Sequence, residues 1–277
     1  MAADPLARLI ERLDLESYGA DAFIGYPGRG DGALFGGFVA AQAVVAAGRT
    51  VDQRSLHSLH AYFLRPGRHD VPIHFAVDRI RDGRTFVTRG VAARQLGETI
   101  FQLSASFTKP EEGFAHQDPM PAGAPAPEGL PDWETARATL LGDPSKRRPD
   151  GPIEVRVCDP DSPVPGAKLP ARRRVWMRPR GEVGEDPLWH AALLVYASDR
   201  TLLRTAARPH GMTWRLGVAY SLDHALWFHH PPRFDGWCLY VSESPIAHAA
   251  RALVLGVLYR MDGTRIATVA QEGLLRR

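Results

Sequence analysis

The sequence contains little cysteine, and this scarcity limits the sites that the chain can build. Cys158 and Cys238 are the two cysteines among 277 residues, and they are not in a Cys-x-x-Cys pair. Their spacing excludes a disulfide framework and a cysteine-based zinc site. The histidines at 57, 60, 229 and 230 also lack the HExxH pattern of helical zinc sites. We therefore expect no metal and no other cofactor.

Long apolar runs and targeting segments are also missing. The longest weakly polar run, GGFVAAQAVVAAG, is too short to cross a bilayer. The first residues, MAADPLARLIERL, have no basic segment followed by an apolar one, and LLRR at the other end is not a lipidation or peroxisomal signal. These features predict a cytoplasmic protein with no stable membrane insertion.

The charges show no clustered excess of one sign. Lys and Arg total 34 and Asp and Glu total 31, which gives a formal net charge of +3. This balance is not typical of a nucleic-acid-binding protein, so we expect no nucleic-acid partner. Apolar residues make up 44% of the chain, enough for the core of a globular protein.

The pattern of helices and strands occurs twice along the chain. After a short helix over 4–13, the Ala-rich stretch 34–51 predicts a helix, and four strands follow it. Residues 110–131 are rich in proline, glycine and alanine, and a short helix follows at 132–144. A second helix begins at Asp186 and Pro187. The predicted strands are 54–64, 71–80, 84–95, 99–107, 153–157, 173–178, 219–229, 237–244, 249–260 and 265–273.

The two halves align as a tandem duplication. Pro66 matches Pro231 at an offset of 165 residues, and Gly97 matches Gly263 at an offset of 166. We predict an α+β fold of two units, each a helix with an antiparallel sheet, whose strands pair into one continuous sheet. The expected units are residues 1–109 and 151–277, and residues 110–150 form a Pro-rich linker.

The second copy has polar residues where the first has apolar ones. At these offsets Ser221 aligns with Leu56, and Gln271 aligns with Ala105. Buried polar groups cost about 1–3 kcal/mol each when they lack partners. With Asp199, at or just after the second helix, the hydroxyl and the carboxamide could hold and activate one water molecule. The residues taken singly leave open that Asp199 is an exposed helix end, that Ser221 opens a strand and that Gln271 faces solvent.

A family resemblance favours the chemical interpretation. The blocks LFGGFVAAQA, LHSLHAYFLRPG, LLVYASD, SLDHALWFHHP and TVAQEG resemble, in order and spacing, the type II (TesB-like) acyl-CoA thioesterases. This resemblance implies a double hotdog fold and hydrolysis of acyl-CoA to a free acid and CoA. It also implies a catalytic trio of Asp199, Ser221 and Gln271, with serine in place of the commoner threonine. We further expect a homo-oligomer.

The residues that bind the thioester are harder to predict. Backbone N–H groups of Gly36 and Gly37, at the start of the first long helix, are candidates for binding the oxyanion. His57 and His60 resemble a histidine block of the family, and His60 is a candidate for the substrate site. Because strand residues three apart face opposite sides, we expect at most one of the two histidines to reach the site.

The sequence leaves open the role of one arginine cluster and the reaction that the fold supports. The five arginines of ARRRVWMRPR could bind the phosphates of CoA, or they could form the charged face of an outer strand. The absence of a G-x-S-x-G motif argues against Ser221 as the nucleophile of an α/β-hydrolase. An enoyl-CoA hydratase or a non-catalytic acyl-CoA-binding protein could have the same fold.

Overall fold

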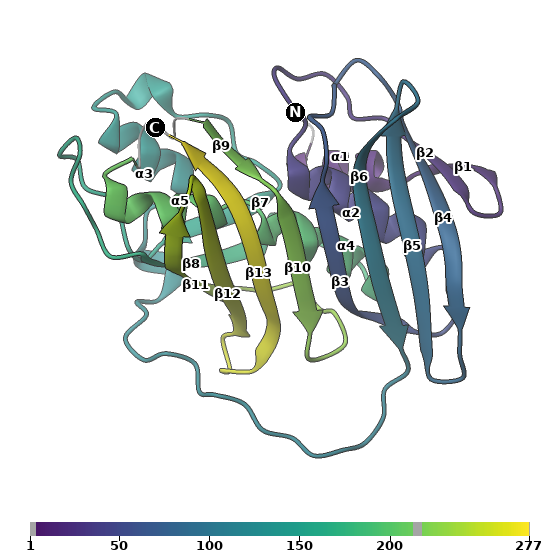
Figure 1. The fold of residues 1–277 in the computed structure, drawn as a ribbon. Helices are drawn as coiled ribbons and strands as arrows, with labels where there is room; N and C mark the ends of the chain where they lie inside the picture. The colour runs from purple at the N-terminus through teal and green to yellow at the C-terminus, as the bar shows by residue number, and fades with distance from the viewer. Residues whose placement is uncertain (1–3, 213–217, 277) are drawn as a thin grey trace.

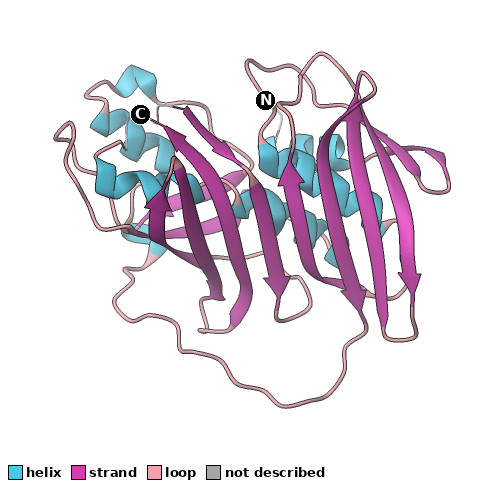
Figure 2. Cartoon of the chain, viewed as in Figure 1, coloured by secondary structure: helices cyan, strands magenta, loops and turns pink. Residues whose placement is uncertain are grey.

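One antiparallel sheet forms most of the molecule. The computed structural model describes residues 4–212 and 218–276, and it contains a 13-stranded sheet with helices on one side (Figures 1 and 2). The helices are α1 Pro5–Leu13, α2 Gly36–Gly48, α3 Trp133–Leu140, α4 Pro187–Ser198 and α5 Leu202–Ala207. The strands are β1 Glu16–Gly19, β2 Ala22–Gly25, β3 Ser55–Phe63, β4 Ile73–Asp82, β5 Phe86–Gln95, β6 Glu98–Thr108, β7 Ile153–Val157, β8 Arg172–Pro179, β9 Val218–Ser221, β10 Asp223–Phe228, β11 Cys238–His248, β12 Arg251–Arg260 and β13 Arg265–Arg276.

The order of the strands is symmetric about the middle of the sheet. It runs β1-β2-β4-β5-β6-β3 in the first half and β10-β13-β12-β11-β8-β7 in the second, and β9 also pairs with β13. The two halves join where β3 and β10 pair, in a register that sets Leu59 opposite Leu226. The predicted continuous sheet is therefore observed, and the pairing removes one exposed sheet edge from each half.

Each half wraps its sheet around one apolar helix. Every residue from Gly37 to Ala47 of α2 is buried, which is typical of a helix enclosed on all sides. In the second half, α4 begins with Asp186, whose carboxylate accepts the Leu188 N–H at 2.9 Å, and with Pro187 in the first turn. A Cβ on Gly37 would lie 2.8 Å from the Tyr196 carbonyl oxygen, so the start of α2 lies against the end of α4.

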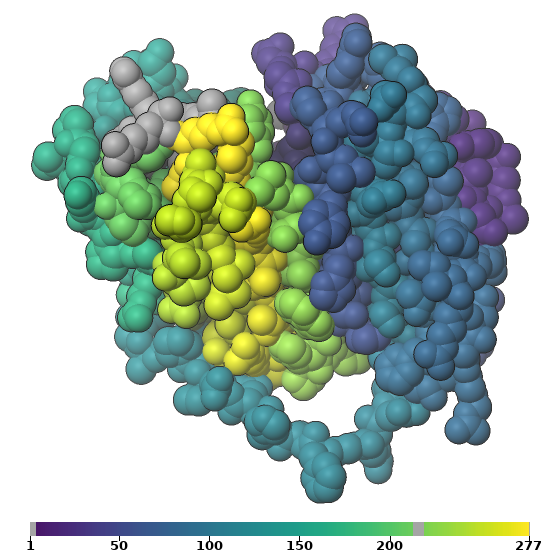
Figure 3. Space-filling view, in the orientation of Figure 1, coloured from purple at the N-terminus to yellow at the C-terminus, as the bar shows by residue number. Residues whose placement is uncertain are grey.

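The segment that joins the halves packs against the outer face of the second half. Gln117 accepts the Arg265 N–H at 3.0 Å and donates to the Gly263 carbonyl at 2.9 Å. Further on, the Trp176 indole donates to the Pro125 carbonyl at 2.8 Å. Met120, Ala124 and Leu130 pack on the small apolar cluster of Trp176, Leu239 and Tyr259. Between these contacts and β6, part of the segment stands off from the body of the molecule (Figure 3).

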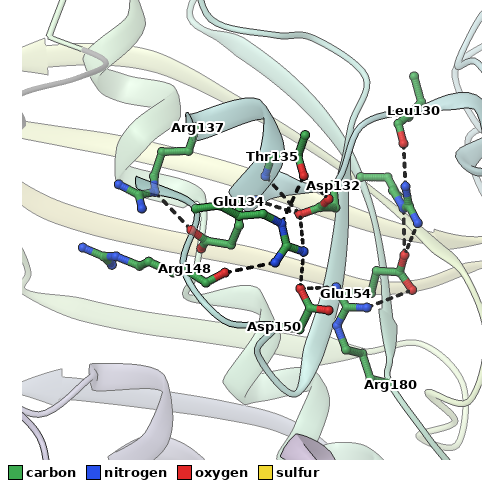
Figure 4. A network of polar contacts seen from close by, with 11 residues as sticks. Leu130, Asp132, Glu134, Thr135, Arg137, Arg148, Asp150, Glu154 and Arg180 are labelled. Atoms are coloured by element: carbon green, nitrogen blue, oxygen red, sulfur yellow. Dashed lines mark hydrogen bonds and ion pairs between the residues drawn. The ribbon is translucent and has the colours of Figure 1, made fainter. Parts of the chain in front are cut away.

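A network of ion pairs fixes the end of this segment to β7 and β8. Arg147 pairs with Asp150 at 2.5 Å, and Asp150 also lies 3.7 Å from Arg180. Figure 4 shows Asp150, Glu154 and Arg180 in this network. Glu154, on β7, accepts hydrogen bonds from Arg156 and Arg178. Burial raises the pKa of the Glu154 carboxyl, but these two arginines outweigh it, and the net shift is downward.

The elements differ from the sequence predictions in three places. The short strands β1 and β2 were not predicted, because four-residue edge strands carry little periodicity. The predicted second helix is two helices, since α4 ends at Ser198 and α5 begins at Leu202. The predicted strand over 219–229 is divided at Leu222 into β9 and β10.

Candidate active site

Asp199 lies where the two halves of the molecule meet. It is the C-cap residue of α4, and its Oδ2 accepts the backbone N–H of Gly37 at 2.8 Å. N–H groups in the first turn of a helix have no partner within the helix, and the N-terminus of a helix attracts negative charge. The first half of the chain therefore holds the carboxylate that the second half supplies.

Ser221 and Gln271 complete a hydrogen-bonded cluster with Asp199, which we call the polar trio. Ser221, the last residue of β9, donates from Oγ to Asp199 Oδ1 at 3.2 Å. Gln271, on β13, donates from Nε2 to Asp199 Oδ1 at 3.0 Å and to Ser221 Oγ at 2.5 Å. The structure thus brings together the carboxylate, the hydroxyl and the carboxamide that the repeat comparison singled out.

The trio leaves specific bonding positions open. A carboxylate can accept about four hydrogen bonds, two on each oxygen. Within the described part of the chain, Asp199 Oδ1 accepts from Ser221 and Gln271, and Oδ2 accepts from Gly37, so one position is left on Oδ2. Ser221 Oγ accepts from Gln271 and keeps a second acceptor position. Both N–H bonds of the Gln271 carboxamide are used within the trio, so a water molecule would contact Asp199 and Ser221 rather than Gln271.

A cavity of about 670 Å³ opens in front of Asp199 and Ser221. Figure 3 shows the cleft between the two halves beside β9. The wall is mostly apolar and comes from both halves: Leu34, Phe35, Val39, Phe63, Ile100 and Phe101 from the first, and Leu203, Leu222 and Leu274 from the second. Arg65, Arg200 and Arg204 add positive charge to this lining. The cavity thus combines an apolar surface, a carboxylate and cationic groups.

A second hollow of similar size, about 680 Å³, lies apart from the trio. Arg8, Asp150, Glu154 and Arg178 line it, together with residues around Pro179. The trio does not contribute to it, and its carboxylates are bound to arginines. We therefore assign no chemistry to this hollow.

Gly36 and Gly37 differ in what their N–H groups contact. The Gly37 N–H is bound to Asp199, so in this arrangement it is not available to an oxyanion. The Gly36 N–H makes no hydrogen bond within residues 4–212 and 218–276, and Gly36 lines the cavity. A Cβ on Gly36 would lie 3.1 Å from Asp199 Oδ2, which shows how closely this backbone approaches the carboxylate.

The structure does not bring His60 to the polar trio. His60 is exposed on the outer face of the sheet, where it packs edge-to-face on Trp227 with ring centroids 5.2 Å apart. His57 is on the same face and bonds Ser106 Oγ at 2.7 Å. The expectation that these two histidines face opposite sides is wrong, because the register with β6 shifts between Leu56 and Ser58.

The same irregularity occurs in the second copy and explains the position of Ser221. The register against β13 shifts by one residue between the pairs Ser221–Gly273 and Ala225–Ala270. Leu222, at the shift, donates to the Glu272 carbonyl at 2.9 Å, and its own carbonyl accepts the Phe63 N–H at 2.9 Å. As a result, Ser221 and His224 both point inward although they are three residues apart.

His224 is the site residue that the sequence analysis did not identify. Its side chain is buried, and Nδ1 lies 2.8 Å from Gln271 Oε1. The repeat comparison contained the signal, since at an offset of 165 residues His224 aligns with Leu59. Regular strand alternation predicts the opposite orientation for this residue, because without the bulge His224 would face away from Ser221.

The arginines of ARRRVWMRPR are bound within the protein. Arg173 pairs with Asp161, Arg174 with Asp159, and Arg172 with Glu243. The other two, at positions 178 and 180, contact Glu154. None of the five lines the cavity at the trio. They therefore stabilise the outer strands and do not face a ligand at this site.

Across residues 4–212 and 218–276, no group of three His, Cys, Asp or Glu side chains is placed to hold a metal ion. In the same part of the chain, no helix has the length and apolar character needed to cross a membrane.

Comparisons with known proteins agree on one family. A family model described as acyl-CoA thioesterase matches residues 145–274, and one described as acyl-CoA thioesterase N-terminal domain matches residues 26–108. The chain is 40% identical over 257 residues to acyl-coenzyme A thioesterase 8 of Mus musculus, covering 88% of this chain and 80% of the relative. It is 39% identical over 251 residues to acyl-CoA thioesterase 2 of Haemophilus influenzae, covering 88% and 87%.

Solved structures give the same result. The acyl-CoA thioesterase II TesB2 from Mycobacterium marinum superimposes with a TM-score of 0.80 at 39% identity, covering 97% of this chain and 98% of that one. A protein with a hot dog fold from Alicyclobacillus acidocaldarius shares 18% identity at a TM-score of 0.78, covers 98% of both chains, and is evidence for the fold alone. The predicted α+β double hotdog is confirmed.

Proposed function

Because this chain belongs to the type II, TesB-like acyl-CoA thioesterase family, whose members hydrolyse thioester bonds, we propose that Asp199 and Ser221 hold the attacking water and that Gln271 orients both. One observation carries the proposal. A carboxylate, a hydroxyl and a carboxamide from α4, β9 and β13 are hydrogen-bonded to one another at the wall of an apolar cavity. The open acceptor positions on Asp199 Oδ2 and Ser221 Oγ would each take one hydrogen of the water.

The reaction needs a base but no covalent intermediate. The water oxygen attacks the carbonyl carbon of the thioester while Asp199 accepts a proton, and a tetrahedral intermediate forms. The carbon–sulfur bond then breaks, and CoA leaves as a thiolate. That thiolate takes up the proton from Asp199, so the products are a carboxylic acid and CoA.

The oxyanion of the tetrahedral intermediate requires a donor in a site that excludes water. We assign this role to the N–H of Gly36, because Gly36 lines the cavity and this N–H is not bonded within the described residues. Gly37 has a different role, since its N–H holds the Asp199 carboxylate. His60 lies on the outer face of the sheet, so we leave it out of the substrate site.

The acyl chain fits the apolar part of the cavity, between Phe35, Phe63 and Leu203. Free energy of about 25 cal/mol per Å² of buried apolar surface would favour its transfer from water. We further propose residues 1–109 and 151–277 as the two hotdog units, residues 110–150 as the connection, and a cytoplasmic homo-oligomer as the working form.

The first test replaces the base and its orienting amide. We expect Asp199→Asn and Gln271→Ala each to lower turnover of acyl-CoA at least about a hundredfold, since the proton acceptor is lost in one and loses its alignment in the other. Release of free CoA, detected with a thiol reagent over acyl-CoAs from short to long, measures the rate. Circular dichroism and thermal melting check that each variant is folded.

Two variants serve as controls. Ser221→Thr keeps the hydroxyl and should retain activity, whereas Ser221→Ala should lose it. Glu272, next to Gln271 in the chain, binds Arg251 on the outer face of the sheet. Glu272→Gln should therefore not change turnover. Near-normal turnover in both the Asp199 and the Gln271 variants would refute the assignment. Hydration of crotonyl-CoA would favour the hydratase instead. Tight acyl-CoA binding without CoA release would favour the non-catalytic binding protein.

A further inference from the structure

A buried group of polar side chains continues from the trio into the core. His224 Nε2 lies 2.9 Å from Ser198 Oγ, and His224 Nδ1 lies 2.8 Å from Gln271 Oε1. Tyr240 donates its hydroxyl hydrogen to the Ser198 carbonyl at 3.1 Å. All four side chains are almost completely buried, so water does not compete for these bonds.

The polar trio requires one particular end of the Gln271 carboxamide to face Asp199. An ionised carboxylate only accepts hydrogen bonds, so the group 3.0 Å from Asp199 Oδ1 must be the NH₂ of Gln271. Its oxygen, Oε1, then points at His224 and needs a donor. The Nδ1 atom of His224 must therefore carry a hydrogen.

The other nitrogen of His224 does not disturb this arrangement. Ser198 Oγ lies within hydrogen-bond distance of both His224 Nε2 and the Val195 carbonyl, at 2.9 and 3.0 Å. A neutral imidazole accepts the Ser198 hydrogen at Nε2, whereas an imidazolium donates to Ser198, which then donates to Val195. In both cases the Nδ1–H bond to Gln271 is kept.

We propose that His224 is a positioning residue that fixes the orientation of the Gln271 carboxamide and thereby aligns Asp199 and Ser221. From β10, which follows Ser221 in the chain, His224 contacts β13, which carries Gln271, and the last turn of α4, next to Asp199. This inference rests on the proposed function of the trio. Among the contacts of the described residues, the bond from His224 is the one outside the trio that favours this amide orientation over its reverse.

The duplication supplies an independent argument. Three inward positions differ in polarity between the copies: Ser221, His224 and Gln271 stand where the first copy has Leu56, Leu59 and Ala105. The first half therefore shows that the fold accepts leucine at the position of His224. The histidine is not required by the architecture, and its partners in the second half are the groups proposed for catalysis.

The test compares two substitutions of His224. His224→Leu installs the residue that the first copy has, and we expect kcat to fall at least about tenfold with KM nearly unchanged, because the buried hydrogen bond that orients Gln271 is lost. His224→Asn places an N–H donor near the Nδ1 position and should recover much of that loss. A wild-type kcat in His224→Leu, or a folded His224→Asn that is no better than His224→Leu, would overturn the proposal.

A double-mutant cycle separates this inference from the proposed function. In a Gln271→Ala background, His224→Leu should lower kcat no further, since the amide that it orients is absent. An equal additional loss there would show that His224 acts by another route and would overturn the proposal. Near-normal turnover of Gln271→Ala alone would refute the proposed function, and the measurement below would still test the orientation.

The protein also provides a matched histidine. His190 on α4 is buried too, but its Nδ1 accepts the Phe234 N–H at 3.0 Å, so its Nε2 carries the hydrogen and bonds the Gly184 carbonyl. Nitrogen-15 NMR of the wild-type protein should find Nδ1 protonated in His224 and only Nε2 protonated in His190. A neutral His224 with its hydrogen on Nε2 would overturn the proposal. His190→Leu should lower the melting temperature and leave kcat unchanged.

Discussion

The Asp199 carboxylate is held by groups from distant parts of the chain. Gly37 lies 162 residues before it, and Gln271 lies 72 residues after it. Among the described residues, these bonds and that from Ser221 leave one accepting position, on Oδ2, which lies close to Gly36 at the wall of the cavity. A base held in this way loses little conformational freedom when substrate binds, which is the condition for efficient proton transfer.

The two cysteines lie in environments that suppress the reactivity of their thiols. Burial raises the pKa of the Cys238 thiol to about 12, and burial together with the nearby Asp159 carboxylate raises that of Cys158 to about 11. We expect neither thiol to react appreciably with iodoacetamide at pH 8 in the native protein, because the thiolate is the reactive form. Mass spectrometry after labelling gives the readout, and the chain in denaturant, which should be labelled at both positions, is the control.

The same shifts predict how stability changes in alkali. An unfolded thiol loses its proton near pH 9, whereas these native thiols keep theirs until about pH 11 and 12. Between about pH 9 and pH 12 the native state therefore binds more protons than the unfolded state, so the free energy of unfolding falls as the pH rises. Rapid labelling of either cysteine in the folded protein, or a stability that does not change above pH 9, would contradict these environments.

At the scale of elements, the contact between α2 and α4 depends on glycine. A methyl group on Gly37 would lie 2.8 Å from the Tyr196 carbonyl oxygen and 2.7 Å from the Phe35 ring. We expect Gly37→Ala to push the helices apart, to lower stability by about 1–3 kcal/mol, and to reduce kcat by weakening the bond to Asp199. Thermal melting and CoA release measure the two effects.

Gly48, at the other end of α2, is the control for this substitution. Its added methyl group would meet the end of the Leu188 side chain, which can rotate away, and not backbone. Gly48→Ala should therefore retain turnover and cost less stability than Gly37→Ala. Equal effects of the two substitutions would indicate that the contact with Tyr196 is not decisive.

Periodicity and internal repetition predicted much of this architecture, but not its irregular points. The apolar helix at α2 and the long strands of the sheet carry strong patterns, and the offset between the copies identified Ser221 and Gln271. The bulges at His57 and Leu222 carry no local signal, because one extra residue leaves composition unchanged while it moves each following side chain to the other face. For this reason His224 cannot be recognised as a site residue from strand alternation, and the two histidines of β3 share a face that alternation does not predict.

At the scale of the whole molecule, two similar halves produce one polar trio. Asp199 is the C-cap residue of α4, whereas the C-cap residue of α2 is Arg49, which is bound to Asp14. Leu56 and Ala105 occupy the positions that correspond to Ser221 and Gln271. The first half therefore lacks the base and both of its partners.

This asymmetry predicts the binding stoichiometry. We expect one molecule of a non-hydrolysable acyl-CoA thioether to bind per chain, as measured by isothermal titration calorimetry. Displacement by free CoA controls for attachment elsewhere on the surface. Two equivalent molecules per chain would contradict the assignment of the first half as inactive.

Joining both halves in one chain changes what each substitution can do. In a pair of identical subunits around a twofold axis, any new side chain appears twice, so a group that improves one centre also alters the packing of the other. A covalent tandem has no such restriction. Leu56, Leu59 and Ala105 can specialise in packing, while their counterparts specialise in bond cleavage. The first half then works as a scaffold that contributes the start of α2 and part of the apolar wall to the site of the second half.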